Sequence, residues 1–166
     1  MAREVWVIHG PNLNLLGRRE PKIYGRDTLA AIDARLVSLG TELGLRVSTF
    51  QSNHEGALID RLQIAMDEAD GVVLNPGALT HTSMALGDAL RAMTIPVVEV
   101  HLSNLYAREH ERRTNLTAAA AAGVVMGFGA ASYELALRAL APRATSGGVR
   151  AKGTPAKAKR AKGTKR

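Results

Sequence analysis

The segment Val5-Trp6-Val7-Ile8-His9-Gly10-Pro11-Asn12 joins an apolar run to an abrupt stop near the start of the chain. Four consecutive apolar residues bounded by turn residues are typical of a buried strand. The pair Gly10-Pro11 ends the strand, because proline lacks the backbone N–H that a sheet ladder needs. We therefore predict a strand over residues 4–9 that leads directly into a loop.

A loop of about fifteen residues follows before the next helical pattern, and loops of this length are commonly functional. It contains the polar side chains Asn12, Asn14, Arg18, Arg19 and Tyr24. Gly17 and Gly25 flank part of it, so segment 17–25 could hinge as a lid. Open α/β sheets bind ligands at the carboxyl ends of their strands, where this loop begins.

Helical and strand patterns alternate along the rest of the chain. Apolar spacing predicts helices over residues 28–43, 55–69 and 132–140, and a further helix that ends near residue 92. Short apolar runs predict strands over residues 45–51, 71–74, 96–100 and 123–127. Such alternation without hairpin signals indicates right-handed βαβ units. We predict a flavodoxin-like α/β fold, with a doubly wound, five-stranded parallel sheet of order 2-1-3-4-5 between two helical layers.

Polar residues before the helical patterns are candidate N-caps. They are Asp27 or Thr28 for the first helix, Asn53 for the second, and Thr80 or Thr82 for the third. Gly44 follows the first helix, where glycine commonly ends a helix. The polar residues 103–113 predict a loop with one helical turn.

The charge is unevenly distributed along the 166 residues, whose formal net charge is +7. Nine of the 22 Lys and Arg residues lie in residues 143–166, which contain no Asp or Glu. Residues 1–142 thus carry a net charge of −2, and we predict one flavodoxin-like catalytic domain there. We predict a disordered tail over residues 143–166, because its Ala, Lys, Gly, Thr and Pro residues bury too little apolar surface to fold. The tail is either a solubilising extension or a weak, salt-dependent contact for nucleic acid.

The composition also excludes several classes of protein. Without cysteine, the chain forms neither a disulfide framework nor a thiolate metal site. No apolar run approaches the roughly 18 residues of a membrane span. The amino terminus lacks the apolar core of a signal peptide. We expect a cytoplasmic protein with no membrane partner.

Polar side chains follow the first, third and fourth predicted strands. Glu99 and His101 are two residues apart on the fourth strand, so their side chains share a face. A carboxylate there can orient the imidazole and support its protonated form. The alternative is a structural histidine at a strand end.

Two further segments carry candidate site residues. Pro76-Gly77 and Thr80-His81-Thr82-Ser83 form a turn into a helix, where N–H and hydroxyl groups can hold an anion or a polyol. Helix capping alone would explain the hydroxyls but not His81. Tyr24 could act as a base only if its pKa falls from the usual value of about 10. A nearby arginine lowers such a pKa, and Arg19, helped by Arg108, could do so; the alternative is a tyrosine that only packs.

Four separated segments, in the same order, resemble the type II 3-dehydroquinate dehydratases. They are Gly10-Pro11-Asn12-Leu13-Asn14-Leu15-Leu16-Gly17 with Arg19-Glu20-Pro21 and Tyr24-Gly25; Gln51-Ser52-Asn53-His54-Glu55-Gly56; Asn75-Pro76-Gly77-Ala78 with Thr80-His81-Thr82-Ser83; and Glu99-Val100-His101-Leu102-Ser103-Asn104 with Ala107-Arg108-Glu109 and Arg112. The resemblance covers roughly residues 5–140.

The resemblance implies anti elimination of water from 3-dehydroquinate to give 3-dehydroshikimate through an enolate, in aromatic amino acid biosynthesis. It implies no cofactor, metal or Schiff base. Tyr24 would remove the C2 proton, with Arg19 stabilising the tyrosinate, and Asn12 would stabilise the enolate. His101, oriented by Glu99, would protonate the departing hydroxyl. The implied substrate-binding residues are Asn75, His81, Asp88, Leu102, Ser103 and Arg112, with Arg108 in support.

The resemblance also implies a trimer-based homo-oligomer, with four trimers in a dodecamer and Asp88 reaching the site of a neighbouring subunit. The chain departs from the family pattern at Leu79, Gly87, Tyr106, Glu111 and Asn115. None of these is a proposed proton-transfer residue.

A non-catalytic flavodoxin-like module that binds a phosphate or nucleotide is the alternative function. Against it, no Gly-x-Gly-x-x-Gly motif or Walker lysine follows the first strand.

Overall fold

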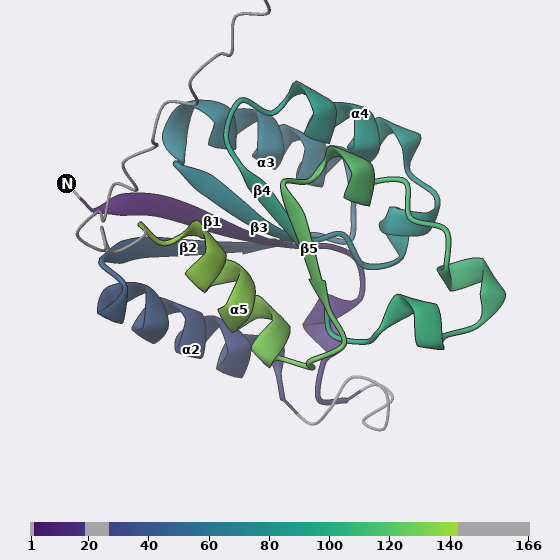
Figure 1. The fold of residues 1–166 in the computed structure, drawn as a ribbon, viewed down its shortest axis with the longest axis horizontal. Helices are drawn as coiled ribbons and strands as arrows, with labels where there is room; N and C mark the ends of the chain where they lie inside the picture. Colours follow the sequence, from purple (N-terminus) through teal and green to yellow (C-terminus); the bar gives the residue numbers. More distant parts are fainter. Residues whose placement is uncertain (1, 19–26, 143–166) are drawn as a thin grey trace, which may run out of the picture.

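The computed structural model describes residues 2–18 and 27–142 (Figure 1). The predictions for Arg19, Tyr24, the lid segment and the tail 143–166 concern residues that lie wholly or mainly outside the described ranges.

Five parallel strands form one sheet with the order β2-β1-β3-β4-β5 (Figure 1). The strands are β1 (Arg3–His9), β2 (Leu45–Gln51), β3 (Gly71–Asn75), β4 (Val97–His101) and β5 (Gly123–Met126). This order confirms the predicted flavodoxin-like topology. In its register, His9 lies opposite both Gln51 and Asn75, so the polar residues that end these strands meet at one edge.

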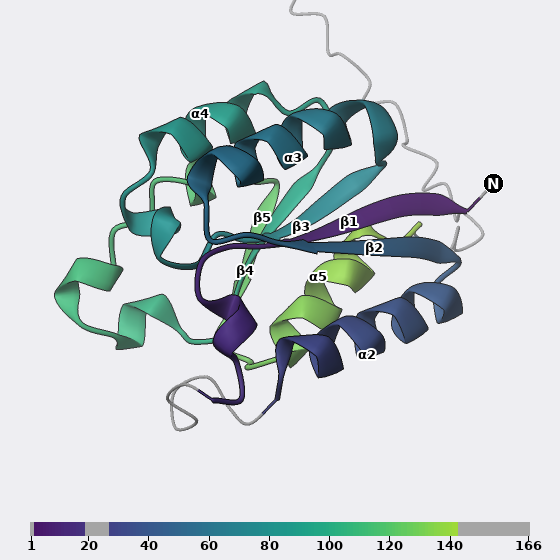
Figure 2. The same ribbon diagram turned by 180° about the vertical axis from the view of Figure 1, so that it is seen from behind.

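Helices cover both faces of the sheet (Figures 1 and 2). α2 (Leu29–Glu42) and α5 (Ala131–Leu140) lie on one face, and α3 (Glu55–Glu68) and α4 (Met84–Ala92) on the other. Side chains of β1 alternate between the two cores: Val5 and Val7 join the cluster with α2 and α5, while Trp6 and Ile8 join the cluster with α3 and α4. This double burial explains why the first strand is continuously apolar.

Some predicted caps are confirmed and others are wrong. The Thr28 hydroxyl accepts from Ala31 N–H and caps α2, and Gly44 follows that helix with φ of 70°. Asn53 does not cap α3, whose N-cap is His54 without a side-chain hydrogen bond.

The prediction of Thr80 or Thr82 as the cap of α4 is also wrong. Ser83 caps this helix by accepting from Leu86 N–H at 2.8 Å. The chain first makes a 3₁₀ helix over Gly77–His81, which delays the start of α4. Thr80 is fully buried in that turn and turns its hydroxyl toward a carboxylate instead.

The connection between β4 and β5 holds more structure than the predicted single turn. It contains three short 3₁₀ helices, over Leu105–Ala107, His110–Arg112 and Ala118–Ala120. The fourth strand, β4, begins one residue later than predicted, at Val97. The carbonyl of Pro96 accepts from Val72 N–H, but Pro96 itself lies before the strand.

Within the described ranges, no helix combines the length and apolar character needed to cross a bilayer.

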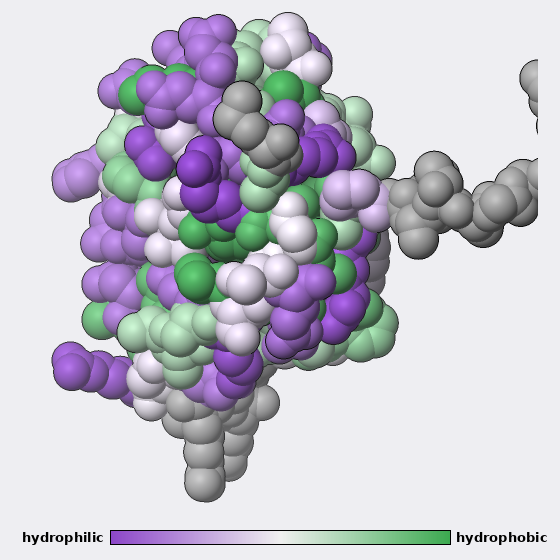
Figure 3. Space-filling model, turned by 90° about the vertical axis from the view of Figure 1, so that its left-hand side faces the viewer, coloured by the Kyte–Doolittle hydropathy of each residue, from purple (hydrophilic) through white to green (hydrophobic). Residues whose placement is uncertain are grey.

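The end of the molecule where β1 and β2 begin presents hydrophobic side chains interspersed with hydrophilic ones (Figure 3).

Candidate active site

A pocket opens at the carboxyl ends of β1, β3 and β4. Its lining comprises Pro11, Asn12, Leu13 and Leu16 after β1; Gly77, Ala78 and His81 after β3; and His101, Leu102, Ser103, Leu105, Arg108 and Arg112 at the end of β4 and beyond. Parallel strands end at one edge of a sheet, so residues far apart in sequence converge there. Most of the predicted binding residues are therefore brought together.

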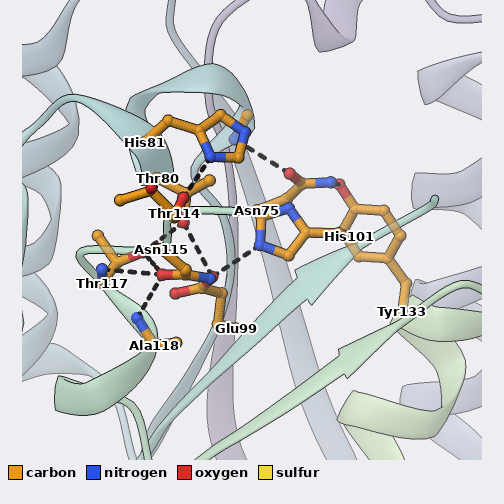
Figure 4. Close-up of polar contacts among 11 residues, drawn as sticks. Asn75, Thr80, His81, Glu99, His101, Thr114, Asn115, Thr117, Ala118 and Tyr133 are labelled. Atoms are coloured by element: carbon orange, nitrogen blue, oxygen red, sulfur yellow. Dashed lines mark hydrogen bonds and ion pairs between the residues drawn. The ribbon is translucent and has the colours of Figure 1, made fainter. Parts of the chain in front are cut away.

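Glu99 and His101 form a buried hydrogen-bonded pair at this edge (Figure 4). His101 Nε2 lies 2.7 Å from Glu99 Oε1, and the two residues are only 4% and 0% exposed. Their spacing of two on β4 places both side chains on the same face. A carboxylate this close fixes the orientation of the ring.

The Glu99 carboxylate accepts two more hydrogen bonds at the same oxygen. They come from Asn115 Nδ2 at 2.6 Å and from Thr80 Oγ1 at 3.1 Å. Burial acts to raise the pKa of Glu99, but the hydrogen bonds from His101 and its other neighbours outweigh burial and lower the pKa. Glu99 is therefore an ionised partner for His101.

The pairing with Glu99 determines which nitrogen of the His101 ring can exchange a proton with a ligand. Because Nε2 donates to an ionised carboxylate, Nδ1 is the nitrogen left to exchange a proton with a molecule in the pocket. His101 can thus act as a general acid or base through Nδ1.

Backbone donors fix the orientation of Asn115. Its Oδ1 accepts from the N–H groups of Thr117 at 2.9 Å and Ala118 at 2.7 Å (Figure 4). Its Nδ2 is consequently directed at Glu99. Asn115 therefore stabilises the ionised carboxylate, a role that the sequence did not suggest.

His81 presents a defined nitrogen to the pocket. Its Nδ1 lies 2.6 Å from the carbonyl oxygen of Thr114 (Figure 4). A carbonyl only accepts, so Nδ1 carries the proton. In the neutral ring Nε2 is then an acceptor, which suits the hydroxyl of a polar ligand.

Asn12 is held in an unusual backbone conformation by the loop after β2. Its φ of 66° lies in the left-handed region, which asparagine tolerates better than most residues. Its N–H donates to Asn53 Oδ1 at 2.9 Å, and Gln51 Nε2 donates to the same oxygen at 3.1 Å. Asn53 thus supports Asn12 rather than capping α3.

Two arginines give the pocket rim a positive charge. Arg108 Nη1 lies 3.4 Å from Ser103 Oγ, and both Arg108 and Arg112 contact Glu109. The hydrogen bond from Arg108, followed by a backbone hydrogen bond and that from Arg112, lowers the pKa of Glu109 to about 2. Arg108 and Arg112 both line the pocket, where guanidinium groups can bind an anionic ligand.

Other predicted site residues are not part of the pocket lining. Asp88 is exposed on α4, where it pairs with Arg91. Asn75 is 2% exposed and lies directly behind the pocket wall, with its Oδ1 accepting from Gly77 N–H at 3.1 Å. Arg19 and Tyr24 are outside the described residues.

The supporting roles of Asn53, Thr80 and Asn115 were missed from the sequence. Their contacts join residues between 16 and 41 positions apart, and no spacing pattern signals such pairs. Asn53 and Thr80 do lie within the segments that resemble the dehydratases, which was the only available signal.

The chemistry that the described residues offer is proton transfer and anion binding. Across residues 2–18 and 27–142, no cluster of three or more His, Asp or Glu side chains is placed to hold a metal ion.

Comparisons with known proteins agree with this geometry. The sequence model of the family described as "Dehydroquinase class II" matches residues 3–141. The chain is 55% identical over 139 residues to a 3-dehydroquinate dehydratase from Nitrosomonas eutropha, covering 83% of this chain and 96% of that protein. It is 56% identical over 145 residues to the enzyme of the same name from Thermus thermophilus, covering 87% and 97%.

A solved structure shares the fold as well as the sequence. The type II dehydroquinase from Propionibacterium acnes superposes with a TM-score of 0.82 at 42% identity, covering 84% of this chain and 97% of that chain. Sequence and fold agree over nearly the full length of these relatives, and the chain belongs to the class II dehydroquinase family.

Proposed function

We propose that this protein is a carbon–oxygen lyase that dehydrates 3-dehydroquinate to 3-dehydroshikimate, in the shikimate pathway toward aromatic amino acids. Family membership supports the substrate, because relatives about 55% identical carry the name 3-dehydroquinate dehydratase. The observation that carries the chemistry is the buried Glu99–His101 pair, with the Nδ1 nitrogen of His101 beside a pocket that Arg108 and Arg112 also line. Elimination of water needs such a proton donor at the departing hydroxyl.

The pocket offers a site for each polar part of the substrate. The carboxylate would be bound by Leu102 N–H and the Ser103 hydroxyl, under the charge of Arg108. The ring hydroxyls would be bound by Asn75, His81 and Arg112. For His81, Nε2 is the acceptor, since Nδ1 is committed to Thr114.

The first step would be removal of the C2 proton by Tyr24. Arg19 would lower the pKa of the Tyr24 hydroxyl, so that the tyrosinate forms and acts as the base. The C–H electrons move onto the ketone oxygen and form an enolate. Asn12 would stabilise the developing negative charge, and its position depends on Asn53.

The second step would be loss of the C1 hydroxyl. His101 Nδ1 gives its proton to the oxygen as the C–O bond breaks, the enolate electrons form the C1–C2 double bond, and water leaves. Glu99 stabilises the imidazolium before transfer. No step requires a cofactor.

The proposed assembly is a trimer-based homo-oligomer, with four trimers in a dodecamer, in the cytoplasm. The exposed position of Asp88 on α4 supports this, because the side chain is available to a neighbouring subunit. Light scattering on the purified protein tests the assembly.

Ultraviolet absorbance of the conjugated enone product tests the reaction directly. Purified protein mixed with 3-dehydroquinate should produce this absorbance at the same rate with and without a chelator. Borohydride should trap no covalent adduct. Absence of turnover, or an amine–substrate adduct, would refute the proposed function.

A further inference from the structure

A second line of hydrogen bonds lies behind the pocket and ends at Asn75, one of the proposed substrate-binding residues. It joins Asp33 on α2, His9 at the end of β1, Tyr133 on α5 and Asn75 at the end of β3. His9 Nε2 lies 2.9 Å from Asp33 Oδ1, and His9 Nδ1 lies 2.8 Å from the Tyr133 hydroxyl. Asn75 Nδ2 lies 2.9 Å from that hydroxyl (Figure 4).

A backbone donor at one end and a carboxylate at the other fix the directions of the hydrogen bonds in this line. Gly77 N–H must donate, so the oxygen of Asn75 accepts it and the Asn75 nitrogen faces Tyr133. The Tyr133 oxygen accepts from Asn75, and its own proton goes to His9 Nδ1. The Asp33 carboxylate can only accept, so His9 Nε2 carries the ring proton and donates to it, and in the neutral ring Nδ1 is the acceptor for Tyr133.

The line is buried except at its Asp33 end. His9 and Tyr133 are 0% exposed and Asn75 is 2% exposed, whereas the Asp33 side chain is 25% exposed. Burial, reinforced by the charge of Asp33, raises the pKa of Tyr133 despite the hydrogen bond from Asn75. Tyr133 thus keeps its proton, and each buried polar group has a partner.

We propose that Tyr133, His9 and Asp33 are positioning residues that lock the Asn75 carboxamide, and with it the Gly77 turn of the pocket wall, in one orientation for the substrate. The inference rests on the proposed function, in which Asn75 binds a ring hydroxyl. With its oxygen committed to Gly77, Asn75 can meet that hydroxyl only as a donor, through its second Nδ2 hydrogen. Removing the lock lets the carboxamide rotate, which weakens substrate binding rather than proton transfer.

Tyr133→Phe is the primary test, with Tyr106→Phe as its matched control because Tyr106 is 65% exposed. Tyr133→Phe should raise KM for 3-dehydroquinate about tenfold, the loss expected for one buried hydrogen bond, and change kcat less than about twofold. Tyr106→Phe should leave both constants within about twofold. A folded Tyr133→Phe variant with unaltered KM would overturn the proposal.

The exposed end of the line offers a second variant that is less prone to misfolding. Asp33→Ala should raise KM in the same direction by about threefold, because water can replace part of the lost contact. Asp67→Ala, at an exposed position of α3, is the control. Should Tyr133→Phe not fold, an Asp33→Ala variant with wild-type KM would decide against the proposal.

Solid-state NMR of protein carrying ¹⁵N-labelled histidine reads the line directly. Wild-type His9 should show a bare Nδ1 and a protonated Nε2, and Asp33→Ala should mix the two tautomers. A protonated Nδ1 in the wild type would contradict the proton order. This signal does not depend on turnover, so it tests the proton order even if 3-dehydroquinate is not the substrate. If the wild type and all variants were inactive, that result would count against the proposed function alone.

Discussion

At the scale of single residues, Glu99 is a buried charge that pairs with His101. It is completely buried, yet its hydrogen bonds keep its pKa below the ordinary value of 4.5. A carboxyl group whose pKa is lower in the folded state than in the unfolded state stabilises the protein above the unfolded pKa. That contribution is lost as the pH falls through the folded pKa.

Glu99→Gln tests this linkage by removing the charge while keeping the shape. Near about pH 7 the wild type should have the higher midpoint of thermal unfolding, and the gap should narrow below about pH 4.5 as the wild-type carboxylate becomes protonated. The exposed Glu68→Gln serves as a control and should show no such gap. A gap that stays constant across this pH range would mean that folding does not lower the pKa of Glu99.

Tyr24→Phe tests the proposed base. The variant should lose about 10²-fold to 10⁴-fold in kcat, the usual contribution of a positioned acid or base. Binding of a substrate analogue should persist, because the carboxylate and hydroxyl sites remain. Turnover at the wild-type rate would assign the base to another residue.

At the scale of elements, the loop between β2 and α3 controls a residue that belongs to a different loop. Asn53 accepts from both Asn12 N–H and Gln51 Nε2, so it holds the left-handed turn after β1. Asn53→Ala should lower kcat about tenfold by releasing Asn12. The control Gln63→Ala, exposed on α3, should leave kcat unchanged. Normal kcat in folded Asn53→Ala would show that Asn12 holds its position alone.

The start of α4 depends on a single cap. Ser83→Ala removes the acceptor for Leu86 N–H and should lower the free energy of unfolding by about 1 kcal/mol. Ser38→Ala, at an exposed site within α2, should lower it far less. Equal effects in denaturant titrations of the two variants would argue against the cap.

The helices and strands themselves were largely predictable, because apolar periodicity and Gly or Pro breakers are local properties. Caps were less so. Thr28 and Ser83 both resemble N-caps in sequence, but so do Asn53, Thr80 and Thr82. The 3₁₀ turn over Gly77–His81 shifted the start of α4, and the choice among Thr80, Thr82 and Ser83 depended on that shift.

At the scale of the whole molecule, the charge divides the chain into two regions. Residues 143–166 contain nine Lys and Arg side chains, while residues 1–142 carry a net charge of −2. Deleting residues 143–166 should leave kcat and KM within about twofold of the full chain and should abolish any salt-dependent binding to nucleic acid. A large loss of turnover would show that the tail belongs to the catalytic domain.

The sequence by itself determined the order of helices and strands, the parallel sheet, the pocket at its carboxyl edge and the pairing of Glu99 with His101. Each follows from periodicity, chain breakers and strand parity, which act within a few residues. Only the tertiary structure decided which groups support the site: Asn115 and Thr80 at Glu99, Asn53 at Asn12, and the line from Asp33 to Asn75. These hydrogen bonds join distant segments whose distances depend on strand register and helix packing, and no local pattern in the chain encodes them.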